Sequence, residues 1–246
     1  MLAALDMSVP AADGLVLKGT LTYPSGRAGT VYPLAILAHQ YPSTRDSFAP
    51  LVRELLAAEI ATLAFDERGH GASTQGPHGP VVVDTPEGLG LDAFGAAFVS
   101  SAQRVAFGRI ENDILRVASW GAFQNFIDPS RLVLIGASVG ASGALLAAPT
   151  IAGLRGVATL GAAGAPAFGP DGADRIRRTL EQLAIPYFLA SSTDDPFEGG
   201  ANVRRWSNGL AHVTARLVPG AGHAMAIYYE VHTDLLRFLR DALDVE

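Results

Sequence analysis

The feature that most constrains the fold of this chain is an alternation of short apolar runs with longer segments of helical periodicity. The apolar run LVLI at residues 132–135 is the most strand-like of them. Further buried strands are predicted at residues 34–39, 60–65, 156–160, 185–190 and 213–218. Helices are predicted at residues 48–58, 110–126 and 224–243. Strands separated by helices favour parallel pairing, so the pattern predicts a doubly wound, mostly parallel α/β sheet with helices on both faces.

Two segments carry more detailed expectations. The period-two alternation of residues 15–23, LVLKGTLTY, predicts an antiparallel strand at an edge of the sheet. In the helix predicted at 110–126, one apolar stripe should face the core, and Asp128-Pro129 should end the segment. The stripe consists of Ile114, Leu115, Ala118 and Phe123. Ligands of such sheets bind beyond the carboxyl ends of the strands, where candidate functional residues are therefore expected.

Composition favours one globular domain over residues 1–246, because hydrophobic residues make up 49% of the chain and no repeat or low-complexity linker divides it. The net charge is −6 and no basic run is present, so no nucleic-acid partner is expected. The chain has no cysteine, which excludes disulfides, thiol catalysis and Cys-ligated zinc.

Neither a targeting segment nor a membrane span is predicted. Residues 1–10 have no positive region and carry Asp6, unlike a secretory signal peptide. The longest apolar stretch, residues 145–163, is interrupted by proline, glycine and arginine. We therefore expect a cytoplasmic protein with no membrane partner.

A Gly-x-Ser-x-Gly motif, GASVG at residues 136–140, lies between the LVLI strand and a run of small residues at 141–148. Glycines at both ends allow a very tight turn that lifts the hydroxyl of Ser138 above the sheet, with free N–H groups of the next helix beneath it. The alternative is a glycine-rich turn with an N-capping serine. The motif fits neither a Walker loop nor a dinucleotide fingerprint, so no cofactor is expected.

A histidine and two aspartates follow other predicted strands. His223 comes after the last strand, behind the glycines of GAGH, and a serine nucleophile needs such a base. Asp194 and Asp195 follow the strand at 185–190, where a carboxylate could orient that histidine. Either aspartate could instead have a turn or helix-capping role. The order Ser…Asp…His is the one expected for this type of sheet.

Taken together, these segments resemble α/β-hydrolase fold serine esterases, in particular bacterial carboxylesterases and dienelactone-hydrolase-like proteins. The likeness covers nearly the whole chain. It is carried by GASVG at 136–140, DERGHGAS at 66–73, DPSRLVLIGAS at 128–138, Asp-Pro at 195–196 and GAGH at 220–223. The resemblance implies Ser138 as nucleophile, His223 as base and Asp195 as acid, because the family's acid often precedes a proline in this loop.

The resemblance also implies an oxyanion hole with two backbone donors. One is the N–H of Val139, directly after the nucleophile. The other would be that of Tyr41, in the loop His39-Gln40-Tyr41-Pro42, although Gln40 departs from the family's usual His-Gly. For His39 we favour a structural role that ties down this loop. In the segment 66–73, Arg68 and His70 are expected to pin neighbouring loops.

Residues 74–107 are poor in charge and contain apolar residues at 89, 91, 94, 98 and 99, the first of them Leu89. We slightly favour the interpretation that this segment is a framework helix with longer loops. The alternative is a small flap over the acyl site or a dimer contact. It is too short for a large cap.

The resemblance implies a carboxylesterase-type serine hydrolase that cleaves short to medium acyl esters through an acyl-enzyme. Thioesterase, lactonase, amidase or peptidase activity stays open, as does a non-catalytic small-molecule receptor on the same fold. The expected partner is a small-molecule ester, and formation of a homo-oligomer stays open.

Overall fold

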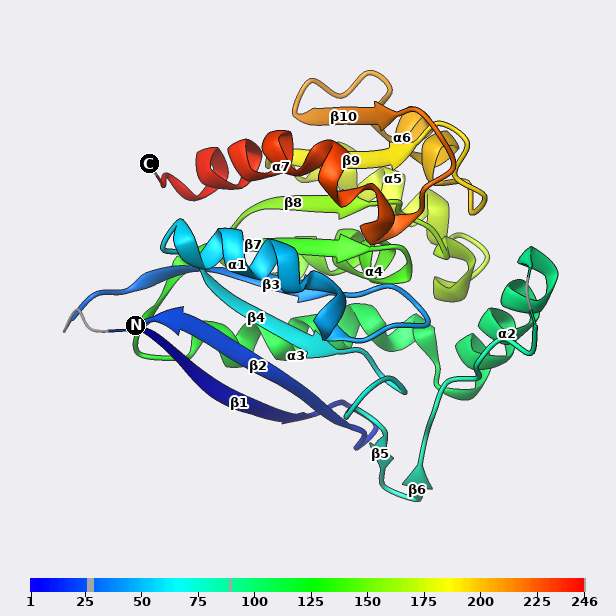
Figure 1. Ribbon diagram of the computed structural model, residues 1–246, viewed down its shortest axis with the longest axis horizontal. Coiled ribbons are helices and arrows are strands. Elements are labelled where there is room, and N and C mark those ends of the chain that lie inside the picture. Colours follow the sequence, from blue (N-terminus) through cyan, green and yellow to red (C-terminus); the bar gives the residue numbers. More distant parts are fainter. Residues whose placement is uncertain (26–28, 89, 246) are drawn as a thin grey trace.

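The computed structural model describes residues 1–25, 29–88 and 90–245. In these residues ten strands form one mixed sheet in the order β10-β9-β8-β7-β3-β4-β2-β5-β6, with β1 paired to β2 (Figure 1). The strands are β1 (Leu2–Pro10), β2 (Val16–Pro24), β3 (Tyr32–Ala38), β4 (Ala61–Asp66), β5 (Gln75–Gly76), β6 (Gly79–Pro80), β7 (Ile127–Ala137), β8 (Leu154–Leu160), β9 (Tyr187–Ser192) and β10 (Val213–Val218). The strands from β4 to β10 in this order pair in parallel, as predicted.

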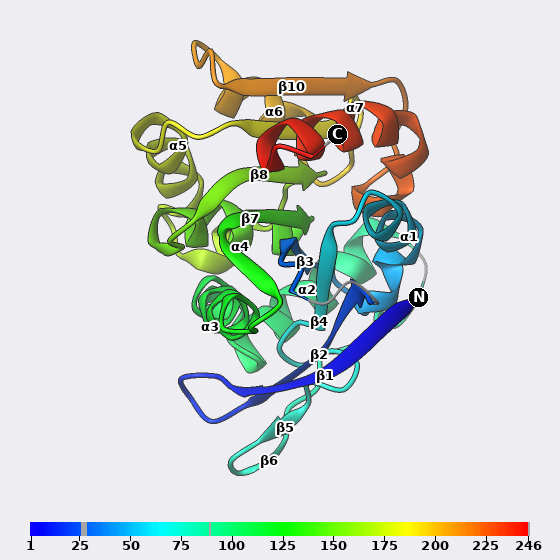
Figure 2. The same cartoon turned by 90° about the vertical axis from the view of Figure 1, so that its left-hand side faces the viewer.

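Helices cover both faces of the sheet (Figure 2). The helices are α1 (Ala49–Ala57), α2 (Leu91–Arg104), α3 (Ile110–Ala122), α4 (Val139–Ala147), α5 (Gly172–Gln182), α6 (Gly199–Ser207) and α7 (Tyr228–Leu243). Helices α1 and α7 bury their apolar faces on one side, and α3 to α6 pack on the other. None of the helices in the described ranges has the length and apolar character that a membrane span requires.

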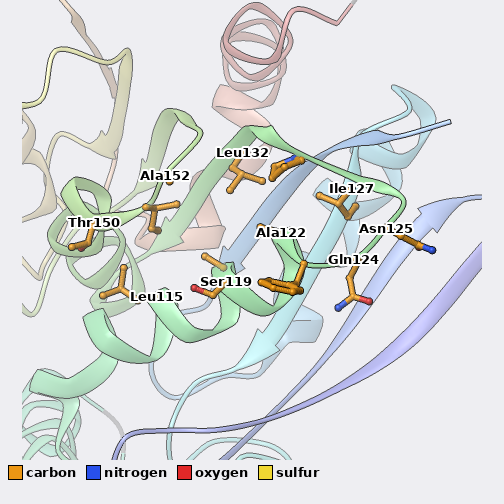
Figure 3. A pocket seen from close by; sticks show the side chains of 13 residues that line it. Leu115, Ser119, Ala122, Gln124, Asn125, Ile127, Leu132, Thr150 and Ala152 are labelled. Atoms are coloured by element: carbon orange, nitrogen blue, oxygen red, sulfur yellow. The ribbon is translucent and has the colours of Figure 1, made fainter. Parts of the chain in front are cut away.

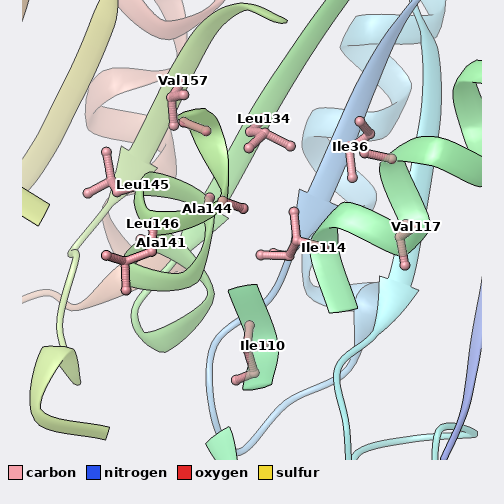
Figure 4. Packing of buried hydrophobic residues seen from close by; sticks show 14 of the residues in the cluster. Ile36, Ile110, Ile114, Val117, Leu134, Ala141, Ala144, Leu145, Leu146 and Val157 are labelled. Atoms are coloured by element: carbon pink, nitrogen blue, oxygen red, sulfur yellow. The ribbon is translucent and has the colours of Figure 1, made fainter. Parts of the chain in front are cut away.

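The central strands are buried on both faces, because each face meets a helix layer. All seven residues of β3 are buried, and they alternate between the two layers. Ile36 packs with Leu134 of β7 and with α3 and α4 (Figure 4), whereas Leu37 belongs to the cluster under α1 and α7. A continuous apolar run was therefore the right signal for these strands.

Three expectations about residues 15–129 are wrong. Residues 16–23 of the predicted segment fall in an antiparallel strand, β2, but this strand is not at the edge, because β1 pairs with its outer side. In β1 the burial pattern is irregular, with Met7 buried and most of its neighbours exposed, so periodicity gave no signal. Helix α3 ends at Ala122, and Phe123 of the expected core stripe is 91% exposed. Residues 128 and 129 belong to β7 rather than to a break before it.

Buried charges fix the loop that follows β4. The guanidinium of Arg68 donates from Nε to Asp113 Oδ2 of α3 at 2.6 Å and from Nη1 to the Val105 carbonyl at 2.9 Å. It also contacts Asp13 Oδ2, 3.1 Å from Nη1. Arg68 thereby joins three segments, in agreement with the loop-pinning role expected for it.

Breaking this ion pair should destabilise the fold. Asp113→Asn keeps the side-chain volume but leaves the buried Arg68 cation without its main counter-charge, which costs about 3 kcal/mol. The free energy of unfolding in urea measures the loss. The matched control is Arg155→Ala, which removes the exposed pair Arg155–Asp244 and should cost less than about 1 kcal/mol. Equal losses in the two variants would contradict this account of the Arg68 network.

Candidate active site

Ser138 lies in a strained turn between β7 and α4, where its backbone adopts φ 53° and ψ −120°. The turn needs the two flanking glycines, because a Cβ at Gly136 would lie 2.4 Å from the Cα of Ala141. One at Gly140 would lie 2.5 Å from the carbonyl oxygen of Ala38. Side chains at either position would push α4 or the end of β3 away. The sequence therefore forces the serine into the sharp strand-to-helix turn expected from the motif.

The side chains of Ser138, His223 and Asp195 form one hydrogen-bonded chain. The Oγ of Ser138 lies 2.8 Å from Nε2 of His223. The Nδ1 of His223 lies 2.8 Å and 2.9 Å from the two carboxylate oxygens of Asp195. A carboxylate only accepts, so Nδ1 carries the proton and Nε2 is free to accept from the serine hydroxyl. Asp194 is exposed and contacts the Thr193 hydroxyl instead.

The carboxylate of Asp195 is held as an anion. Burial raises its pKa, but hydrogen bonds from His223, from the N–H of Phe197 and from the hydroxyl of Ser191 outweigh burial, so that the net pKa lies below its usual value. Next to it, the hydroxyl of Ser192 donates to the carbonyl of Gly222 at 2.6 Å, joining the end of β9 to the loop that carries His223. Sequence reasoning did not single out these serines, although the run SSTDDP contains them.

The loop after β3 packs directly on the serine turn. A Cβ at Gly140 would lie 2.6 Å from the carbonyl oxygen of His39, so the two backbones touch. Val139 is the first residue of α4, and the first N–H groups of a helix have no acceptor within it. The ring of Tyr41 is buried, and its hydroxyl donates to the carbonyl of Asp84 at 2.6 Å. The structure thus brings the segments of both expected oxyanion donors to the turn.

His39 has a structural environment. Its Nδ1 donates to the carbonyl of Gln40 and its Nε2 accepts the N–H of Glu67, each at 2.9 Å. Burial lowers the pKa of His39 to about 4. Burial and the neighbouring His39 lower that of His70 to about 3. Both rings are therefore neutral at pH 7, and His39 ties the loop after β3 to the end of β4.

The carboxyl of Glu67 is a buried group that the sequence did not reveal. Both of its oxygens are buried without a hydrogen-bond partner among the described residues, and Oε1 would lie 2.5 Å from a Cβ at Gly140. Burial raises its pKa well above the usual value, with Asp113 adding to the shift. Glu67 therefore supports the turn as packing beneath Gly140.

A small apolar cavity of about 80 Å³ opens beside Ser138. Its other walls are Phe94, Gly95 and Phe98 of α2, together with Ala163, Gly164 and Phe197. Helix α2 thus lies over the serine, at the carboxyl ends of the strands (Figure 1). Leu91 and Val99 of the same helix point outward, and Leu89 lies outside the described residues.

A larger cavity, of about 760 Å³, lies far from the serine, between α3 and the amino ends of β7 and β8 (Figure 3). Its walls include Leu115 and Ala122 of α3 and Leu132 of β7, and none of its lining residues is ionisable. The hydroxyls of Ser119 and Thr150 therefore have no acid or base beside them in this cavity that could activate them. Among the described residues, moreover, no group of three or more His, Cys, Asp or Glu side chains is placed to hold a metal ion.

No protein-family model and no curated protein matches this sequence. Solved structures do match. Acetyl xylan esterase 1 from Thermoanaerobacterium sp. has a TM-score of 0.73 and 15% identity, over 98% of this chain and 84% of its own. An esterase from Pyrococcus furiosus has a TM-score of 0.67 and 18% identity, over 98% and 92%. Dienelactone hydrolase from Anabaena variabilis has a TM-score of 0.64 and 17% identity, over 96% and 97%. The chain has the α/β-hydrolase fold.

The neutral histidines give a prediction for stability. In the unfolded chain a histidine has a pKa of about 6.5, so between pH 6.5 and 4 the unfolded state binds protons that folded His39 and His70 do not. The free energy of unfolding should therefore fall as the pH falls through this window, by up to about 1.4 kcal/mol per pH unit for each ring. Urea unfolding at pH 6 and pH 5 measures the slope.

The variant His70→Gln should lower that slope by up to about 1.4 kcal/mol per pH unit, because one of the two neutral rings is gone. His78→Gln, at an exposed position, is the matched control and should leave the slope unchanged. A slope that is the same in the His70 variant and in the wild type would show that this ring is not held neutral.

Proposed function

We propose that the protein is a carboxylesterase-type serine hydrolase that cleaves esters with short to medium acyl chains through an acyl-enzyme. One observation carries the proposal. The Oγ of Ser138 lies 2.8 Å from Nε2 of His223, whose Nδ1 is bound by both carboxylate oxygens of Asp195. A nucleophile, a base in the correct tautomer and an ionised orienting acid are the parts that acyl transfer by serine requires.

In the first half of the reaction Ser138 attacks the ester carbonyl carbon while its proton passes to Nε2 of His223. The imidazolium that forms is stabilised by the Asp195 carboxylate at Nδ1. The carbonyl oxygen becomes an oxyanion, which the N–H groups of Val139 and Tyr41 bind. When the intermediate collapses, the ester C–O bond breaks, Nε2 returns its proton to the leaving alcohol, and the acyl group stays on Ser138.

In the second half a water molecule takes the place of the alcohol. His223 accepts a proton from this water as its oxygen attacks the acyl carbon. The same two N–H groups bind the second oxyanion. Its collapse breaks the bond to Ser138, whose oxygen recovers the proton from Nε2, and a carboxylic acid leaves. The cycle uses only these side chains, two backbone amides and water.

The choice of an ester bond is supported by the similar solved structures, which are those of an acetyl xylan esterase, an esterase and a dienelactone hydrolase. A short acyl chain is supported by α2, which lies over the serine and leaves a small cavity. In this proposal α2 is the flap of the segment 74–107, and the substrate is a small-molecule ester.

Replacing the serine tests the nucleophile. Ser138→Ala should abolish turnover of p-nitrophenyl esters, a loss of roughly a million-fold, because no acyl-enzyme can form. A fluorophosphonate probe should label the wild type at Ser138 and leave this variant unlabelled. Ser130→Ala, at an exposed serine at the start of β7, is the control and should keep both activity and labelling. Activity retained in Ser138→Ala would refute the proposal.

A pair of variants tests the acid. Asp195→Asn removes the carboxylate that fixes the tautomer of His223, and in a serine protease the same change lowered kcat about 10⁴-fold. Asp194→Asn, one residue away and exposed, is the matched control and should lose little activity. Steady-state kinetics with p-nitrophenyl acetate distinguishes the two. If the Asp194 variant were the inactive one, Asp195 would not be the residue that orients His223 during turnover.

A further inference from the structure

The outer helix α2 presents two phenylalanine rings to the serine, at the rim of the core on which they also pack. Phe94 and Phe98 are four residues apart and lie on the same face of the helix as its buried residues Ala97 and Ser101. Both rings line the cavity beside Ser138 and contact the ring of Tyr41, at centroid distances of 5.4 and 5.5 Å. This face of α2 is therefore built against the site.

A third ring closes the cavity from the acid's loop. Phe197 packs on the imidazole of His223, at 4.6 Å between ring centroids, and on Phe94, at 4.7 Å. Its N–H donates to Asp195 Oδ1, so the position of its backbone is fixed by the same carboxylate that orients the base.

The wall formed by Phe98 has little room to move. Its ring contacts Phe107 at 5.5 Å between centroids, and its Cζ lies 3.0 Å from the place a Cβ on Gly164 would take. Helix α2 itself is tied down, because Ser101 Oγ accepts the N–H of Asp84 at 2.8 Å. Asp84 also accepts the Tyr41 hydroxyl at its carbonyl and pairs with Arg104 through its carboxylate. Helix α2 is therefore fixed to the loop after β3 and cannot move away from the serine without breaking these contacts.

We propose that Phe94, Phe98 and Phe197 set the substrate class by limiting the acyl pocket to acetyl and propionyl groups. The inference rests on the proposed function and makes its acyl range narrower. The cavity measures about 80 Å³, whereas an engineered cavity that takes benzene, a six-carbon ring, measures about 150 Å³. Two or three carbons fit beside Ser138, and a longer chain either displaces one of these rings or extends out of the cavity and loses its contacts there.

The kcat/KM values of p-nitrophenyl acetate, propionate, butyrate, hexanoate and octanoate test the proposal. The wild type should prefer acetate or propionate and fall at least roughly ten-fold by hexanoate, since one methylene in a tight pocket is worth about 10- to 200-fold. Phe98→Ala should raise the ratio of hexanoate to acetate turnover at least roughly ten-fold, because it opens the pocket. Phe94→Ala should shift the ratio in the same direction. Phe94 contacts the ring of Tyr41 but not that of Phe107, so this variant serves as the test if Phe98→Ala does not fold.

Two control variants separate pocket size from general damage. Val99→Ala shortens an exposed side chain of α2, next to Phe98 in the sequence. Phe123→Ala removes an exposed ring far from the serine. Neither should change the ratio of hexanoate to acetate turnover.

The outcomes distinguish this inference from the proposal on which it rests. A wild type that hydrolyses esters but prefers butyrate, hexanoate or octanoate overturns the inference alone. So does an unchanged ratio in folded Phe94→Ala and Phe98→Ala variants. A wild type that hydrolyses no ester and is not labelled at Ser138 overturns the proposed function and the inference together.

Discussion

The strained backbone at Ser138, with a positive φ of 53°, is the constraint on which the rest of the site depends. A non-glycine residue in this conformation costs about 1–3 kcal/mol and persists only where its surroundings hold it. Here β7 is flanked by β3 and β8, and the missing side chains at Gly136 and Gly140 let α4 and the end of β3 approach to contact distance. The same close packing brings together the hydroxyl, the start of α4 and the Tyr41 loop.

His223 and Asp195 reach this turn because parallel strands end at one edge of the sheet. Residues 191 and 192 of β9 pair with residues 217 and 218 of β10, so the loops that carry Asp195 and His223 leave the sheet side by side. The bond from the Ser192 hydroxyl to the Gly222 carbonyl holds these loops together. Strand register, rather than closeness in sequence, thus places a histidine 85 residues from the serine it contacts.

The period of the apolar residues and the order of the motifs predicted the central strands of the sheet and the turn at Ser138. Buried strands such as β3 and β7 are continuous apolar runs because helices cover both faces, and the glycines of GASVG allow the tight turn at Ser138. Strand β1 was missed because its pairing to β2 leaves most of it exposed, and Phe123 was wrongly placed because α3 ends one residue earlier. The part played by Phe197 depends on contacts with α2 and His223, which no local pattern records.

The central claim, that Ser138 carries the acyl group, is tested most directly by acid-quenched mass spectrometry of the wild type during turnover of p-nitrophenyl acetate. The account predicts a protein fraction heavier by one acetyl group, with the modification mapped to the peptide that contains Ser138. Turnover with no acylated protein would contradict it, and so would an acetyl group located on a residue other than Ser138.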